Sequence, residues 1–398
     1  MSLTVELGAI GGFTLDDPEK GVLDNITYRL EGVLFSDVTA FAKEVAISRG
    51  KNRDLQRFQA GRVQMSLKNQ NREFDPLFPS AQFAENLKPR LPVRISYSGE
   101  RIFTGIIEDW NYSFDVSGES IADIVAVDEL SLLAQQELST GTAIPQTSGE
   151  RVSAILDLEE VNWPAGERDI DTGVSELGAD VFDGNVLRYL QKVEASEQGQ
   201  LFVNRSGDLQ FRSRLDATPT SDSFLTLADD GTGIPYTKVD VNYGTELLYN
   251  RATVSGPPGS VTRNNLSSQT TYGITEYDFD TLVNTLTQLA NLSDFIVSKY
   301  AEPELRFEAL QVSFDGVTTA QRNDLTALEL GDVMLVKFTP NGVGVADPIE
   351  QYGQVIRIDH DIRVDAHDMI IGLASLEWNF LVLDDAEFGK LNSGHLAF

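Results

Sequence analysis

The sequence predicts a mainly β, multi-domain protein, a β-rich α+β chain. Apolar residues alternate with polar ones along several segments, which is the period of a half-buried strand. The 32 glycines and many Asn and Asp turn sites fit short strands joined by tight turns. Helical spacing is confined to three places, so we expect β-barrels decorated by a few helices. With 398 residues and 41% hydrophobic residues, two to four domains of ~100–200 residues can each bury a core.

The clearest strand patterns lie far apart in the chain. Val63, Met65 and Leu67 alternate with polar residues, and a similar pattern runs from Val355 to Val364. The segment 201–211 has apolar residues on both sides of Asn204–Asp208, where Gly207 can supply the positive φ of a turn. This segment predicts a hairpin.

Three segments have the period of a helix. One follows Asp183, a plausible cap, and has an apolar stripe of Val186, Leu187, Leu190 and Val193. A longer helix is expected after Asp280, with an inward face of Leu282, Val283, Leu286, Leu289 and Ala290. A short one is expected from Asp128 through Ala134.

Composition changes suggest the domain boundaries. Residues 141–149 are small and predict a linker, 217–236 are rich in Ser, Thr, Asp, Gly and Pro, and 256–269 predict a long flexible loop. We therefore expect an N-terminal domain, a middle α+β domain, a third domain with an inserted helix at about 280–299, and a C-terminal extension, at residues 1–138, 139–236, 237–380 and 381–398.

The overall charge excludes some classes of function. Lys plus Arg number 31 and Asp plus Glu 61, a net charge of −30, so neither stable nucleic-acid binding nor docking on an anionic membrane is expected. The absence of Cys excludes disulfides, Cys-ligated zinc, iron–sulfur clusters and thiol catalysis. No run approaches the ~18 apolar residues of a membrane helix, and the N-terminus does not resemble a secretory signal, so we expect no membrane anchor.

No catalytic or cofactor motif is present. The sequence lacks a phosphate-binding P-loop, an HExxH motif and a GxSxG elbow. The His and Asp residues of 359–361 and 365–368 could hold a metal, but we expect them at the surface of a turn. Residues 229–233 resemble part of a calcium loop and are expected to form a turn. We therefore predict no catalytic, metal-binding or cofactor-binding residue, and no enzyme activity.

The cations are concentrated in one segment. From Lys43 to Arg72 there are eight cations against Glu44 and Asp54, whereas 157–183 holds nine acids and the single cation Arg168. The simplest interpretation is two solvated faces. A second is a basic edge that meets an acidic edge between copies in a ring, and DNA binding is a weaker third because interleaved aromatics are lacking. The second predicts an assembly interface at Arg49, Lys51, Arg53, Arg57, Arg62, Lys68 and Arg72.

The segment from Val45 to Phe78 also carries a family resemblance. It is similar to the N-terminal signature of tailed-bacteriophage minor tail proteins of the tail-tip or baseplate-hub type, with Lys51 where Arg is common. The matching positions are Arg49, Gly50, Arg57, Phe58, Ala60, Gly61, Asn69, Asn71, Arg72, Phe74, Asp75 and Pro76. Weaker likenesses follow in order at 103–134, 199–214, 247–256, 328–338 and 353–362.

The resemblance implies a structural protein of the virion tail tip. Such hubs are homotrimers with two tube-like β-barrel domains per chain, so that six barrels adapt the six-fold tail tube to a three-fold spike or fibre around a bore for the genome. The implied partners are the tail tube or distal tail protein, the tape measure protein and the central spike or fibre. Three chains would carry about −90, which repels a polyanion in the bore.

Two alternatives remain at this stage. One is a hexameric distal tail ring protein with one tube-like barrel per chain. The other is a glycan-binding or glycan-degrading tail-tip adhesin, which would need a cleft lined by aromatics or paired carboxylates. The three tryptophans, Trp110, Trp163 and Trp378, lie far apart in the sequence.

Overall fold

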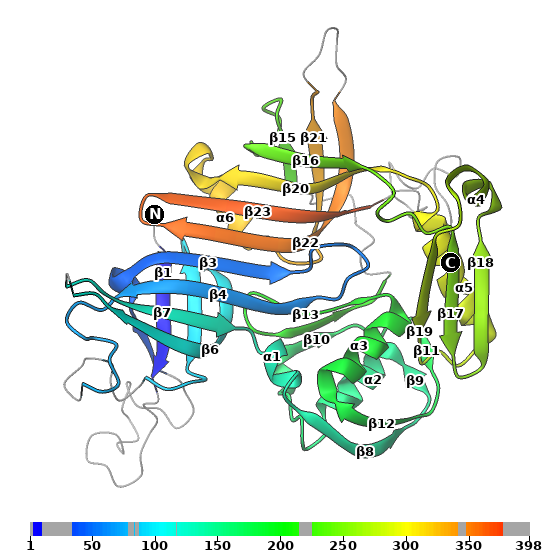
Figure 1. Cartoon of the computed structure of the whole chain (residues 1–398), viewed down its shortest axis with the longest axis horizontal. Coiled ribbons are helices and arrows are strands. Elements are labelled where there is room, and N and C mark those ends of the chain that lie inside the picture. Colours follow the sequence, from blue (N-terminus) through cyan, green and yellow to red (C-terminus); the bar gives the residue numbers. More distant parts are fainter. Residues whose placement is uncertain are drawn as a thin grey trace.

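Strands dominate the computed structural model, which confirms the predicted fold class (Figure 1). The structure describes residues 3–9, 34–78, 83, 87–116, 118–214, 225–340 and 348–376. Within them the strands form one 13-stranded sheet and four small sheets. No helix of the described residues is long and apolar enough to cross a membrane.

The large sheet is built from both ends of the chain. Its order is β16 (Lys238–Tyr243), β20 (Leu305–Ser313), β23 (Ala366–Ser375), β22 (Ile349–Arg363), β3 (Ala42–Gly50), β4 (Gln59–Lys68), β7 (Ser120–Val127), β6 (Glu100–Phe114), β5 (Pro92–Tyr97), β1 (Leu3–Ala9) and β2 (Leu34–Asp37). In addition β21 (Val333–Phe338) pairs with β22 and β15 (Leu225–Ala228) with β21.

One strand pair joins the N-terminal and C-terminal strand groups. Residues 357–363 of β22 pair antiparallel with residues 44–50 of β3, so the two groups share one continuous sheet. One hydrophobic core underlies both groups, from Val5 and Val45 on one side to Val355 and Met369 on the other. The predicted first and third domains therefore lie side by side in this sheet, while their boundaries stay a prediction.

The period-two patterns fold as expected. On β4, Val63, Met65 and Leu67 are buried and Arg62 and Lys68 point outward. β22 likewise buries alternate residues, and a bulge after Val355 keeps its apolar side chains in the core. The predicted hairpin is also present as β13 (Gln200–Val203) and β14 (Leu209–Arg212), with Gly207 at φ 101°.

Between the two strand groups in sequence lies a smaller α+β unit with its own core. Its helices α2 (Ser148–Leu156) and α3 (Val186–Glu197) pack together beside the β13–β14 hairpin (Figure 1). The remaining elements are α1 (Leu130–Leu133), β8 (Glu137–Ala143), β9 (Gln146–Thr147), η3 (Ala165–Glu167), β10 (Arg168–Ile170), β11 (Glu176–Leu177) and β12 (Asp180–Asn185).

All three predicted helices form, but two begin later than expected. α3 is capped by Asn185, whose Oδ1 accepts a hydrogen bond from the Arg188 N–H, and Asp183 lies within β12. α5 (Leu286–Tyr300) is capped by the Thr285 hydroxyl. Leu282 and Val283 therefore precede α5 and are buried outside it, whereas Leu286, predicted to face inward, is 52% exposed. In each case a cap closer to the apolar stripe provides the hydrogen bond.

Two segments predicted as linker or loop are regular structure. Residues 141–149 end β8, form β9 and begin α2, where Thr147 and Glu150 make a capping box. Residues 256–269 include β18 (Gly259–Asn264) and the start of α4 (Leu266–Tyr272); β18 pairs with β17 (Arg251–Gly256), next to β19 (Glu276–Asp280). Small polar residues hid the strand and helix patterns of both segments. The sequence also did not predict α6 (Thr319–Ala327), η1 (Thr39–Phe41) and η4 (Phe314–Gly316). Residues 215–224 lie outside the described residues.

Candidate assembly interface

The basic segment Lys43–Arg72 forms the central hairpin of the large sheet. β3 and β4 pair antiparallel, and the connection 51–58 joins them at one end (Figure 1). The structure divides the seven predicted interface residues into two classes. Arg49 and Lys51 are buried within the chain, whereas Arg53, Arg57, Arg62, Lys68 and Arg72 are exposed.

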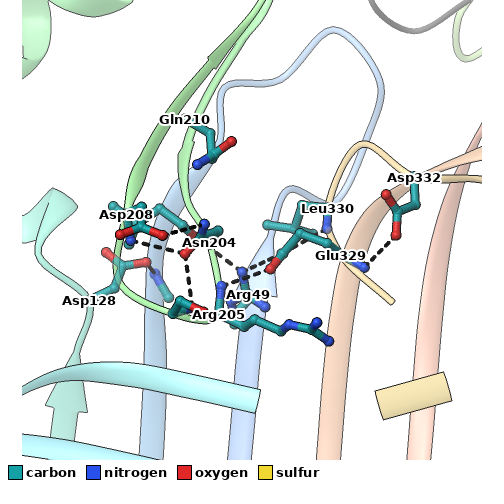
Figure 2. A network of polar contacts seen from close by, with 12 residues as sticks. Arg49, Asp128, Asn204, Arg205, Asp208, Gln210, Glu329, Leu330 and Asp332 are labelled. Atoms are coloured by element: carbon teal, nitrogen blue, oxygen red, sulfur yellow. Dashed lines mark hydrogen bonds and ion pairs between the residues drawn. The ribbon is translucent and has the colours of Figure 1, made fainter. Parts of the chain in front are cut away.

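Arg49 lies at the meeting point of three parts of the chain (Figure 2). Arg49 as a whole residue is 4% exposed. Its guanidinium lies 2.5 Å from the Glu329 carboxylate and donates a hydrogen bond to the Val203 carbonyl at 3.1 Å. β3 supplies Arg49, β13 supplies Val203, and the loop between α6 and β21 supplies Glu329. An ion pair shielded from water in this way is far more costly to break than one at the surface.

Glu329 extends the network to backbone groups. Its carboxylate accepts hydrogen bonds from the Arg205 N–H at 2.8 Å and from the Leu330 N–H at 2.8 Å. The Arg205 side chain in turn donates to the Thr326 carbonyl at 2.6 Å. Asp332 accepts a hydrogen bond from the Glu329 N–H (Figure 2). The β13–β14 turn is therefore held against the loop that precedes β21.

Lys51 joins a second buried cluster around the 51–58 connection. Its ammonium lies 4.8 Å from the centre of the Phe58 ring, and burial lowers the pKa of Lys51. Asp54 accepts hydrogen bonds from Lys299 at 2.8 Å and from the Tyr300 hydroxyl at 2.5 Å. Burial alone would raise the pKa of Asp54, but the charges of Lys299 and Lys51 and these hydrogen bonds hold it well below its usual range. The cluster attaches the connection to α5.

Two further carboxylates are buried beside the hairpin. Asp128 accepts hydrogen bonds from the Gly61 N–H at 2.6 Å and the Leu130 N–H at 3.0 Å, and burial raises its pKa to about 7. Glu194 of α3 accepts from the Leu201 N–H at 3.0 Å, and burial raises its pKa to about 7, opposed by the charge of Lys51. Both acids bind backbone groups at the contact between the hairpin and the middle unit.

The residues that carry the family resemblance have structural roles in the hairpin. Gly50 has φ 112°, and a Cβ there would meet the Ile356 carbonyl oxygen at 2.1 Å. Beyond β4, Asn69 is buried and its Oδ1 accepts from the Phe74 N–H at 3.0 Å. Phe74 is buried, and Asp75 accepts from the Leu77 N–H. The signature thus specifies the turn, the hairpin and the loop after it.

The exposed cations lie at both ends of the hairpin. At the 51–58 end, Arg53 is paired with Glu246 at 2.5 Å and Arg57 donates to Gln191 of α3 at 3.1 Å. Arg62 follows on the outward face of β4. At the other end are Lys68 and Arg72, and Arg72 is paired with Asp75 at 2.6 Å. These five remain available for contacts with another molecule, because exposed ion pairs are worth little.

The histidine cluster differs from the prediction. His360 and His367 are buried, not surface turn residues, because they point from β22 and β23 into the core. His360 Nδ1 and His367 Nε2 lie 3.0 Å apart. The His367 ring packs against Phe314 and Tyr97, with ring centres 3.8 and 4.4 Å apart. Among the described residues no group of three or more His, Cys, Asp or Glu is arranged to hold a metal ion.

The acidic segment 157–183 belongs to the middle unit. Its one cation, Arg168, is paired with Asp157, and Arg212 of β14 lies 2.9 Å from Asp169. The Asp229–Gly233 segment is a turn, as expected, in which Asp230 accepts from Thr232. The roles of Glu329 and Asp54 could not be predicted from local patterns, because their partners are 280 and 245 positions away.

Solved structures share this arrangement of elements, although no family model and no curated protein matches the sequence. The prophage MuSo2 43 kDa tail protein from Shewanella oneidensis is 13% identical with a TM-score of 0.57, over 94% of this chain and 98% of that one. A tail protein from Neisseria meningitidis MC58 is 11% identical with a TM-score of 0.57, over 93% and 95%. This chain has the fold of prophage tail proteins.

A third structure agrees. Prophage tail protein gp18 from Listeria monocytogenes EGD-e is 11% identical with a TM-score of 0.50, over 94% of this chain and 95% of that one. Each likeness spans nearly the full length of both chains, so the tail-protein fold includes the strand groups and the middle unit together. The resemblance first found in the segment Val45–Phe78 is thereby confirmed at the level of fold.

Proposed function

We propose that this chain is a structural protein of a phage tail tip, a hub of which three copies form a ring at the end of the tail tube. The observation that carries the proposal is the tail-protein fold over nearly the whole chain. In the ring, the hub adapts the six-fold tube to a three-fold spike or fibre and leaves a bore for the genome. The chain has no enzymatic role in this proposal.

The β22–β3 pairing supports a ring built from rigid chains. It places two strand groups side by side in one sheet, so three chains would present six groups around an axis. The Arg49–Glu329 pair joins β3 to the loop before β21, and the Asp54–Lys299 pair joins the 51–58 connection to α5, so both link the N-terminal strands to later parts of the chain. A rigid chain suits a ring, because loss of internal freedom on assembly is then small.

The partners in this proposal are further copies of the chain, the tail tube or distal tail protein, the tape measure protein and a central spike or fibre. A net charge of −30 per chain gives the ring a strongly negative field, which keeps the genome from adhering to it. A stable complex with nucleic acid is therefore not part of the function.

The test is to label the chain in assembled particles. An epitope tag at either terminus, detected with gold-conjugated antibody in electron micrographs, should mark one end of the tail, and particles lacking the chain should have tubes without tips. Label along the whole tube, or tips of normal appearance without the chain, would contradict the proposal. Release of reducing ends from host glycans by the purified chain would instead favour the adhesin alternative.

A further inference from the structure

The hairpin of β6 and β7 presents an unusual combination of aromatic and acidic side chains. Trp110, Tyr112 and Phe114 follow one another along one face of β6, with ring centres 6.4 and 6.5 Å apart and nearly parallel planes. The row begins against the core and ends in solvent, where Phe114 is 57% and Val116 is 105% exposed. An apolar row that runs out of a core into solvent is typical of a contact surface.

Within the part of the chain that the structure describes, the backbone of this part of β6 has no strand on one edge. β5 pairs with β6 only up to Ile106, and among the described residues no strand pairs with that edge beyond Ile107. The bond from the Asp115 N–H to the Glu119 carbonyl sets the register with β7, so Tyr112 and Phe114 direct their backbone groups to the free edge. The aromatic residues Tyr112 and Phe114 therefore also present backbone groups that make no backbone hydrogen bond to any described residue.

The hairpin is also acidic. Residues 108–123 contain five acids and no cation: Glu108, Asp109, Asp115, Glu119 and Asp123. Lys68 and Arg72 lie at the same end of the sheet, but they belong to β4 and the loop after it and not to the hairpin of β6 and β7. The fitting partner is therefore a basic surface. Ser117, within the turn, lies outside the described residues.

The chain itself offers a basic surface at the opposite end of the same strands. The 51–58 connection exposes Arg53 and Arg57, with Arg62 at the start of β4. β4 runs from this connection to Lys68, which is opposite Ile121 near the start of β7. The acidic hairpin and the basic connection therefore lie at opposite ends of the same strands (Figure 1). Complementary surfaces at opposite ends associate head to tail, and such contacts close into rings when the rotation permits.

We propose that the β6–β7 hairpin of one copy seats against the 51–58 connection of the next copy. This inference rests on the proposed ring and names its contact: Phe114 and Val116 supply the apolar centre, and Arg53, Arg57 and Arg62 face the acids of the hairpin.

Cysteine cross-linking tests the contact directly, since the natural chain has no Cys. Val116→Cys is mixed with Gln56→Cys under mild oxidation at the highest soluble concentration. Both positions are exposed. A disulfide-linked dimer should form in this mixture, whereas either variant alone and the pair Val116→Cys with Ser260→Cys, an exposed site on β18, should stay unlinked.

A charge exchange provides a second readout. Glu119→Lys or Arg57→Glu alone should weaken the association of chains at least tenfold, and the mixture of the two variants should recover part of the loss. Cross-links confined to the control pair, equal linking in all pairs, or no link at all would overturn the proposed contact. A three-chain ring without the expected cross-link would contradict this contact and leave the proposed function intact. The expected cross-link in a ring of another size would support the contact and contradict the trimer.

Discussion

Arg49 and Glu329 lie 280 positions apart in the sequence and 2.5 Å apart in the structure. Their ion pair sits where the N-terminal strands, the middle unit and the loop before β21 meet, which changes the interpretation of the basic segment. A cation that the composition assigned to an outer edge stabilises the chain internally.

Arg49→Met should destabilise the fold by about 3 kcal/mol, because it leaves the largely buried Glu329 carboxylate without its cation. The matched control, Arg57→Met, removes an exposed cation of the same segment and should change the free energy of unfolding by less than about 0.5 kcal/mol. Chemical denaturation monitored by circular dichroism measures both. Equal stability of the two variants would show that the pair contributes nothing to the fold.

Leu190→Asp should destabilise the middle unit by several kcal/mol, since Leu190 is fully buried on α3 and a carboxylate there would have no partner. Arg188→Asp, two residues earlier on the exposed face, is the control and should leave the melting temperature nearly unchanged. A wild-type melting temperature for Leu190→Asp would refute the packing of α3.

The buried histidine pair should make the fold sensitive to acid. Burial and the charges of His367 and Arg49 lower the pKa of His360 well below its usual range. Burial and the charge of Arg322 lower the pKa of His367 to about 3. Unfolded histidines titrate at about 6.5, so the unfolded chain binds more protons below that pH. Stability is then lost as the pH falls from about 6.5 to about 3.

Each histidine can contribute up to about 1.4 kcal/mol of lost stability per pH unit in that window. The free energy of unfolding, measured by denaturant at several pH values, should fall less steeply for the double variant His360→Asn/His367→Asn than for the wild type. Tyr97, which faces the pair, titrates well above this range, since burial raises its pKa. Parallel slopes for the two proteins would contradict the buried neutral pair.

Glu194 should act in the opposite direction. Its pKa is about 7 in the folded chain, against about 4.3 when unfolded, so the protonated form stabilises the fold below pH ~4. This contribution, on the order of 3 kcal/mol, is lost as the pH rises through 7. Glu194→Gln keeps an acceptor for the Leu201 N–H and should flatten the stability profile between pH ~4 and about 7. A profile identical to that of the wild type would place the titration elsewhere.

Arg53→Glu/Arg57→Glu should weaken assembly and leave the monomer folded, because both side chains are exposed and make only surface pairs. Added salt should weaken the wild-type assembly in the same direction, since the Debye length is ~8 Å at physiological ionic strength. Sedimentation measures the association and circular dichroism the fold. Arg49 is excluded from this variant, because its loss would destabilise the chain itself. Unimpaired assembly of the folded variant would show that these cations are solvated surface residues and not part of an assembly interface.

The sequence predicted the strands well where one face is buried. The alternation around Val63 and Val355 and the turn at Gly207 are local signals, and they specify local structure. The helix starts were less accurate, because Asp183 and Asp280 compete with closer caps, Asn185 and Thr285. Residues 141–149 and 256–269 were misjudged, since small polar residues on exposed strands resemble loops.

The candidate interface could be predicted only in part. Composition located the basic segment, but an exposed Arg53 and a buried Arg49 look alike in sequence, and only tertiary partners distinguish them. The same limit applies to His360 and His367. Their acidic neighbours in sequence indicated a surface turn, but both side chains point into the core from the paired strands β22 and β23. Contacts over hundreds of positions leave no local signal.

The most direct test of the proposed three-copy ring is the native mass of the assembly purified from phage tails or formed by the chain in solution. We expect three copies of the 43.8 kDa chain in a closed ring. Six copies would contradict it in favour of the distal ring protein, and a chain that stays single both at high concentration and in tail preparations would contradict a ring of any kind.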